Sequence, residues 1–181
     1  DEKGFLFLHY FDPHINYDPP APWGPRFVDR PYLGEIAYTD DCIGQVVQKL
    51  KELGIYESTL LIVTSDHGEM LGEHDEFTHS FFVYQSALKI PLIIKVPGRQ
   101  GPRRITDLVG LVDIVPTVCS LMGMDVPAEV HGLDLLDSLV GQASPRRERR
   151  LYCESLTPTK YDAAALLGIV TDRWKYIHTA R

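Results

Sequence analysis

The stretch that decides the fold of this chain is Leu60-Leu61-Ile62-Val63-Thr64-Ser65-Asp66-His67-Gly68-Glu69. Its apolar and β-branched start, followed by turn-forming residues, is typical of a strand buried on both faces. Such strands belong to mostly parallel sheets, in which ligands gather outside the carboxyl ends of the strands. An oxygen ligand from Asp66 beside a nitrogen ligand from His67 suggests a metal site there. The alternative is that Asp66 caps the following turn and His67 is an ordinary loop histidine.

Three further stretches extend this pattern in both directions. Continuous apolar runs predict strands at Phe5–Phe11 and at Pro91–Val96. Between the first run and Leu60, residues 32–53 carry apolar side chains at helical spacing, and Gly54 can end that helix. A helix between two strands favours a parallel, right-handed crossover. The expected fold class is therefore α/β, with a mostly parallel sheet flanked by helices.

The last part of the chain has a different pattern. Residues 141–150 have the composition of an exposed linker. The three segments after it predict strands at 151–154, 164–171 and 174–177, which would begin a small antiparallel sheet. We therefore predict an α/β domain over residues 1–140, and a linker with the start of a C-terminal subdomain over residues 141–181.

Composition excludes several classes of protein. The formal net charge of −7 argues against general nucleic-acid binding, which favours basic patches. No apolar run is long enough for a transmembrane segment, and the first residues lack the pattern of a signal peptide. The 3 cysteines have no metal-binding spacing, so we expect free thiols. Both ends of the sequence suggest a piece of something longer, and the compartment is not indicated.

Two loops carry further candidate residues. His14, held behind Pro13 in a proline-rich loop, is a candidate substrate-facing donor or general acid; the alternative is a loop histidine bonded to a nearby carbonyl. The loop after His67 is dense in titratable groups, and such a loop is usually just solvated. Its position beside the strand end raises the chance that one member turns inward. Its members are Glu69, Glu73, His74, Asp75, Glu76 and His79.

Together these stretches resemble the sulfatase family of the alkaline-phosphatase-like superfamily. The matching motifs occur in the family's order along nearly the whole chain. They are residues 5–20, 64–74, 79–98, 113–117 and 173–177. Residues 1–140 then correspond to the later part of the catalytic α/β domain. Residues 173–177 resemble a strand of the family's C-terminal subdomain.

The resemblance implies specific roles for the candidate residues. In the family a single divalent metal ion, usually calcium and in some branches manganese, magnesium or zinc, is held near the nucleophile. Asp66 and His67 match positions that ligate this metal. His14 matches a histidine that contacts the sulfate or phosphate group and helps the leaving oxygen depart. His79 is the nearest match to a basic residue, often lysine, that contacts the same group. Such positive charge stabilises the oxygens of a tetrahedral anion.

One departure from the family is large. Family members carry two further acidic metal ligands near their N-terminus and a nucleophile in a Cys- or Ser-x-Pro-x-Arg motif, converted to formylglycine in true sulfatases. Neither element occurs in this sequence. We therefore expect the later half of a sulfuric ester hydrolase, inactive alone, whose substrate is a small-molecule or sugar sulfate ester. The alternatives are a phosphonate or phosphate ester hydrolase of the same superfamily and a non-catalytic remnant of the fold.

Overall fold

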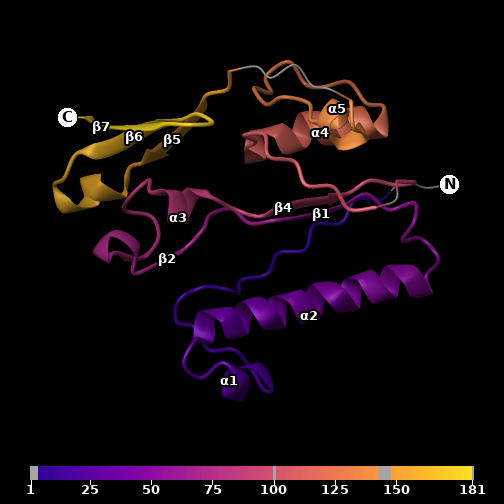
Figure 1. Ribbon diagram of the computed structural model, residues 1–181, viewed down its shortest axis with the longest axis horizontal. Helices are drawn as coiled ribbons and strands as arrows, with labels where there is room; N and C mark the ends of the chain where they lie inside the picture. The colour runs from indigo at the N-terminus through magenta and orange to yellow at the C-terminus, as the bar shows by residue number, and fades with distance from the viewer. Residues whose placement is uncertain (1–3, 100, 143–147, 181) are drawn as a thin grey trace. The chain divides into compact units, whose positions relative to one another are not determined.

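The computed structural model describes residues 4–99, 101–142 and 148–180 (Figure 1). Contacts between residues divide the chain into two compact units, one up to Thr59 and one from Leu60 onward. This division lies far from the predicted domain boundary at residue 140. The boundary at residue 140 stays a prediction. Of the predicted linker, residues 143–147 lie outside the described part of the chain.

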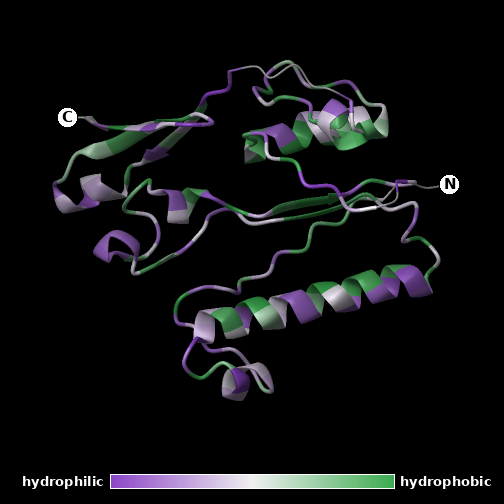
Figure 2. Cartoon of the chain, viewed as in Figure 1, coloured by the Kyte–Doolittle hydropathy of each residue, from purple (hydrophilic) through white to green (hydrophobic). Residues whose placement is uncertain are grey.

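The first unit consists of a proline-rich loop and two helices, α1 (Trp23–Arg26) and α2 (Pro31–Glu52). Helix α2 confirms the helix predicted over residues 32–53. Pro31 suits its first turn, where a missing N–H removes no helical hydrogen bond. Polar and apolar residues alternate along α2 (Figure 2). The helix packs closely on the loop at Gly34, because a Cβ atom there would come within 2.7 Å of Pro19 Cγ.

The strand predicted at Phe5–Phe11 is not formed. Residues 4–12 have neither strand nor helical structure, and Phe5 is 90% exposed. An apolar run becomes a buried strand only when neighbouring strands satisfy its backbone N–H and C=O groups. Within the described residues no strand pairs with this run. The parallel crossover predicted between this run and the Leu60 strand is therefore also absent there.

The second unit begins with β1 (Leu61–Thr64), which pairs with β4 (Leu92–Lys95). Both strands were predicted and are strongly hydrophobic (Figure 2). The pairing is antiparallel, with Val63 opposite Ile93, and β1 is half-buried instead of buried on both faces. Every strand pairing in the three sheets of the described residues is antiparallel. The predicted mostly parallel sheet is therefore not formed there.

Short elements connect β1 to β4. Strands β2 (Met70–Leu71) and β3 (Phe77–Thr78) form a small antiparallel pair around a 3-10 turn, η1 (Glu73–Asp75). Helix α3 (Gln85–Leu88) then leads into β4. A parallel pairing needs a long crossover, usually one helix across the sheet, and this connection contains only a four-residue helix.

Beyond β4, a buried carboxylate ties several segments together. The turn η2 (Leu111–Asp113) leads into α4 (Ile114–Met122), which Gly123 ends in the left-handed conformation. Asp113 is fully buried, but its side chain does not cap α4. It accepts hydrogen bonds from the backbone N–H groups of Gly110 (2.7 Å) and Leu133 (2.8 Å) and pairs with the guanidinium of Arg149. A short helix, α5 (Leu136–Val140), follows.

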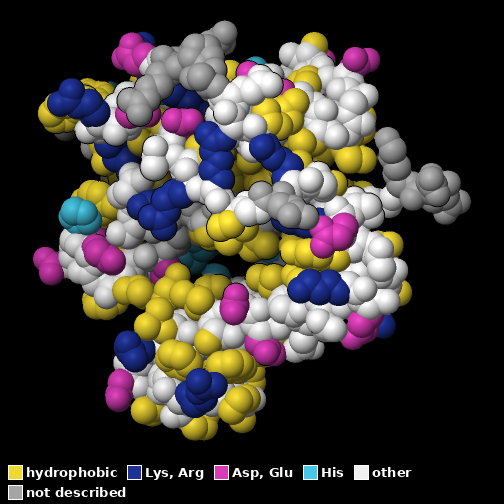
Figure 3. All heavy atoms as spheres, turned by 45° about the vertical axis from the view of Figure 1, so that its right-hand side comes forward, with side chains coloured by type: hydrophobic (Ala, Val, Ile, Leu, Met, Phe, Trp, Pro, Cys, Tyr) yellow, Lys and Arg dark blue, Asp and Glu magenta, His cyan; other side chains and the backbone are white. Residues whose placement is uncertain are grey.

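The small C-terminal sheet is confirmed. Strands β5 (Leu151–Ser155), β6 (Ala165–Val170) and β7 (Lys175–Ala180) pair antiparallel in that order, with η3 (Thr157–Tyr161) between the first two. Tyr152, Ile169 and Tyr176 lie opposite one another across the sheet and stay exposed. Hydrophobic side chains are visible at the surface of the molecule (Figure 3). Among the helices of the described residues, none is long and apolar enough to span a membrane.

Candidate active site

The turn that follows β1 has a tight backbone. Gly68 donates its N–H to the carbonyl oxygen of Ala87 in α3, with 2.8 Å between the two atoms. A Cβ atom on Gly68 would lie only 2.1 Å from the carbonyl oxygen of Ser86. Only glycine therefore permits this approach, and the turn that carries Asp66 and His67 lies directly against α3.

Asp66 and His67 form a local polar pair on this turn. The carboxylate Oδ1 of Asp66 accepts a hydrogen bond from the His67 N–H at 3.0 Å and lies 3.8 Å from His67 Nε2. His67 Nδ1 lies 2.8 Å from the carbonyl oxygen of Gly68. Because a carbonyl can only accept, Nδ1 carries the hydrogen in this contact, and Nε2 is the ring nitrogen on the side of Asp66.

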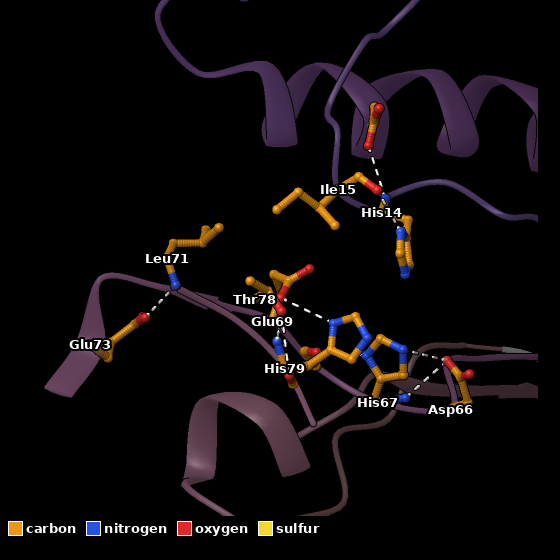
Figure 4. A network of polar contacts seen from close by, with 11 residues as sticks. His14, Ile15, Asp66, His67, Glu69, Leu71, Glu73, Thr78 and His79 are labelled. Atoms are coloured by element: carbon orange, nitrogen blue, oxygen red, sulfur yellow. Dashed lines mark hydrogen bonds and ion pairs between the residues drawn. The ribbon is translucent and has the colours of Figure 1, made fainter. Parts of the chain in front are cut away.

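His79 stacks on the ring of His67. The two imidazole rings stack with centroids 3.8 Å apart and planes at 26°. His79 Nδ1 lies 3.3 Å from Oε1 of Glu69. The Glu69 side chain is 4% exposed and that of His79 is 17% exposed, whereas that of Asp66 is 82% exposed. Figure 4 shows His67 and His79 overlapping, with contacts to Asp66 and Glu69 on opposite sides.

Backbone conformation and distant contacts hold the loop that carries His79. Thr78 and Ser80, which flank it, both have left-handed φ angles, 68° and 86°. The C-terminal sheet contacts this loop at two points. The Ser155 hydroxyl of β5 donates to the carbonyl oxygen of Ser80, and Lys175 Nζ of β7 donates to that of Val83 at 2.7 Å. Burial lowers the pKa of Lys175, because desolvation disfavours its charged form.

His14 lies in the first unit, on the proline-rich loop. Glu35, on α2 and 2% exposed, accepts hydrogen bonds from the backbone N–H groups of His14 (3.0 Å) and Asp18 (2.7 Å). Burial raises the pKa of Glu35, while the two backbone donors act in the opposite direction. His14 Nδ1 lies 2.7 Å from the carbonyl oxygen of Ile15, so the ring orientation is fixed locally.

The structure thus brings together three of the four predicted site residues: Asp66, His67 and His79 lie in one cluster. His14 belongs to the first compact unit, which extends to Thr59. Sequence reasoning missed the roles of Glu69 and Glu35. The sequence places Glu69 in the charged loop but does not predict its contact with His79. Glu35 precedes Thr39 by four residues and Cys42 by seven, so helical spacing places a carboxylate on the same face as these side chains.

The residues after β1 fit part of a metal site. Asp66 offers an exposed carboxylate, and His67 has its Nδ1 bound to a carbonyl, which is how proteins usually orient a metal-binding histidine. Within residues 4–99, 101–142 and 148–180, no group of three or more His, Cys, Asp and Glu side chains could hold a metal ion. The described residues therefore supply at most a part of a ligand set.

Comparison with known families decides the kinship. The family model described as Sulfatase matches residues 1–124. The chain belongs to the sulfatase family. A second family description, N-sulphoglucosamine sulphohydrolase, C-terminal, matches residues 72–181, which include the C-terminal sheet.

Curated relatives agree with this membership. Arylsulfatase K of Bos taurus is 36% identical over 107 residues, which are 59% of this chain and 20% of the relative. Arylsulfatase K of Gallus gallus is 30% identical over 81% of this chain and 28% of the relative. An N-acetylglucosamine-6-O-sulfatase of Bacteroides thetaiotaomicron is 29% identical over 86% of this chain and 28% of the relative. The chain thus spans about a quarter of the length of these relatives.

Solved structures show the same kinship. A phosphonate monoester hydrolase from Silicibacter pomeroyi superposes with a TM-score of 0.72 and 30% identity, over 84% of this chain and 32% of that one. A protein solved in complex with its substrate D-glucosamine-2-N,6-O-disulfate gives a TM-score of 0.67 and 28% identity, over 83% and 31%. These likenesses support the predicted fold class, an alkaline-phosphatase-like α/β fold of which this chain forms a part.

Proposed function

We propose that the protein carrying this chain hydrolyses sulfate esters, and that Asp66, His67 and His79 belong to its active site. Family membership supports the reaction class. The observation that carries the site assignment is the stack of His67 on His79 at the end of β1, with Asp66 beside one ring and Glu69 beside the other. Three candidates predicted from sequence meet there in the fold of a sulfatase.

Each of these residues has a role that its chemistry permits. Asp66 and His67 Nε2 would ligate a divalent cation, with calcium favoured and manganese, magnesium or zinc as alternatives. Such a cation supplies positive charge that stabilises the oxygens of a tetrahedral anion. His79 would bind an oxygen of this tetrahedral anion by donating a hydrogen from Nε2, which requires the imidazolium form, because its Nδ1–H is directed to Glu69. His14 acts as the general acid for the leaving oxygen.

The remaining parts of the reaction lie outside this chain. None of Cys42, Cys119 or Cys153 begins a Cys-x-Pro-x-Arg motif. We infer that the nucleophile and the further acidic metal ligands come from another part of the protein. For sulfate esters, the expected nucleophile is a formylglycine. We also infer that strands from another part of the protein complete a mostly parallel sheet with residues 1–140. Residues 141–181 would begin the C-terminal subdomain.

A sugar sulfate is the substrate class that we favour. The N-acetylglucosamine-6-O-sulfatase and the protein solved with a glucosamine disulfate both match more than four fifths of this chain. A phosphonate monoester is the alternative, because a phosphonate monoester hydrolase also superposes well. Both reactions need positive charge around a tetrahedral anion, so the residues of this chain alone suit either.

The test is hydrolysis by the purified full-length protein. We would compare 4-nitrophenyl sulfate, D-glucosamine 6-sulfate and 4-nitrophenyl phenylphosphonate under identical conditions. Release of inorganic sulfate that is strongly reduced but still measurable in His79→Gln would support the proposal. Hydrolysis of the phosphonate ester with no release of sulfate would favour the alternative. Absence of all three reactions in a protein that carries the nucleophile motif would contradict both.

A further inference from the structure

We propose that Glu69 is a positioning residue that fixes the orientation of the His79 ring, so that its Nε2 edge faces the ester group. This inference rests on the proposed function, since His79 is taken to bind that group. Glu69 itself contacts neither the ester group nor the metal ion and acts only through the imidazole of His79.

Burial makes the carboxylate of Glu69 unusual for this loop. Its side chain is 4% exposed, although it lies only two residues after His67 in a segment rich in exposed charged residues. A buried carboxylate is costly unless donors satisfy it. Oε1 of Glu69 lies 3.3 Å from Nδ1 of His79. The pair thus joins the turn after β1 to a residue ten positions later, across the β2–β3 pair.

This contact restricts the proton on the His79 ring. An ionised carboxylate has no hydrogen to donate, so the Nδ1 atom of His79 must carry the hydrogen that lies between the two groups. Nε2 is then the nitrogen directed away from Glu69. His67 obeys the same rule, because its Nδ1 faces the carbonyl oxygen of Gly68 at 2.8 Å. In both rings of the stack, Nδ1 is therefore the nitrogen that faces an oxygen acceptor.

The stack restricts the plane of the ring as well. The His67 ring lies over one face of His79 with centroids 3.8 Å apart, so rotation of the His79 ring would break the face-to-face contact. Glu69 fixes the remaining choice, namely which edge of the ring points where. Stacking sets the plane and the carboxylate sets the edge, and the two together define where Nε2 lies.

A double-mutant cycle in the full-length protein tests this role. The variants are Glu69→Gln, His79→Gln and the two combined, with 4-nitrophenyl sulfate as the probe. We expect Glu69→Gln to lower kcat about 10- to 100-fold with little change in KM, the usual effect of removing a group that orients another. In the His79→Gln background the same change should cost no more than about twofold, since residues that act as a unit are not additive.

Matched variants separate positioning from folding. Glu73→Gln makes the same chemical change on an exposed carboxylate of the same loop and should leave kcat at the wild-type value. Glu69→Asp keeps the charge on a shorter side chain and should restore part of kcat lost in Glu69→Gln. Equal losses from Glu69→Gln with and without His79 would overturn the proposal, because a purely structural role is independent of the imidazole.

A spectroscopic measurement distinguishes this inference from the proposed function. Side-chain ¹⁵N spectra of the full-length protein, with His79 assigned from His79→Gln, should show hydrogen on Nδ1 in the wild type and a partial loss of that hydrogen in Glu69→Gln. Hydrogen on Nε2 alone, with none on Nδ1, in the wild type would overturn the inference. A wild type without sulfatase activity that still shows this change would overturn the proposed function and support the contact.

Discussion

The imidazole rings of His67 and His79 stack with centroids 3.8 Å apart, although twelve positions separate the two residues in the sequence. The stack joins the end of β1 to the loop that precedes α3. Its geometry depends on the backbone turn at Gly68, which lies directly against α3. The site is therefore sensitive to backbone changes that remove no polar group.

Gly68→Ala is the sharpest test of that dependence. The new Cβ atom would meet the carbonyl oxygen of Ser86 at 2.1 Å, so the backbone must move and carry Asp66 and His67 with it. We expect sulfate release to fall on the order of 100-fold, the usual consequence of misplacing reacting groups by about 1 Å. Steady-state kinetics of the full-length protein would measure this.

The matched control is Gly44→Ala, a substitution in α2 whose new Cβ would meet nothing within 4 Å apart from its chain neighbours and the backbone of the helix itself. It should leave activity unchanged and raise the free energy of unfolding by about 0.5–1 kcal/mol, because alanine loses less backbone entropy in a helix. Equal activity of Gly68→Ala and Gly44→Ala would refute the geometric account of the turn.

Glu35 fixes the His14 loop through two backbone donors, the N–H groups of His14 and Asp18. Glu35→Ala removes both acceptors, so these two amides should exchange their hydrogens with solvent faster than in the wild type. Hydrogen-exchange mass spectrometry of the peptides covering residues 12–20 would detect it. Glu52→Ala, on an exposed position of the same helix, should leave the exchange unchanged; slower or equal exchange in Glu35→Ala would argue against the anchor.

The raised pKa of Glu35 predicts a pH dependence with a defined sign. Its pKa lies above the ordinary value of 4.5 in the folded protein, so the folded state binds more protons just above that pH. The stabilising contribution is complete below the ordinary value and is lost as pH rises through the folded value. Urea unfolding of the wild type and Glu35→Gln across this range should show the wild type losing stability relative to the variant. The opposite trend would mean that the backbone donors outweigh burial.

Asp113 should be a large contributor to the stability of the second unit. It is fully buried, accepts two backbone hydrogen bonds and pairs with Arg149. Asp113→Ala leaves the guanidinium and both donors without this acceptor and should lower the free energy of unfolding by about 3–5 kcal/mol. Asp107→Ala, at an exposed position, should change it by no more than about 0.5 kcal/mol. Similar denaturation midpoints for the two variants would contradict this role.

Local patterns in the sequence predicted the elements whose pairing or packing partners lie within the described residues. Helix α2, the strands β1 and β4, and the C-terminal sheet follow from spacing and composition within short windows. The run Phe5–Phe11 shows the limit. Its composition specifies a buried strand, but a strand forms only where another strand pairs with it, and the described residues provide none.

The same limit explains what was missed in the site. The order of motifs predicted Asp66, His67 and His79 as site residues, because each occupies a recognisable position along the chain. Glu69 contacts His79, and Glu35 contacts His14 and Asp18, whereas composition suggests only that a glutamate is solvated. A buried carboxylate is recognised once the structure shows what surrounds it.

The most direct test of the central claim is the metal content of the full-length protein, measured by mass spectrometry for the wild type and for Asp66→Asn. Asparagine keeps the size of the side chain and removes its charge, so folding should be preserved. We predict about one tightly bound divalent ion per wild-type chain, as in a single-metal site with carboxylate ligands, and a substantial loss in Asp66→Asn together with sulfate release. Unchanged metal content and affinity in Asp66→Asn would contradict the assignment of Asp66 and His67 as ligands.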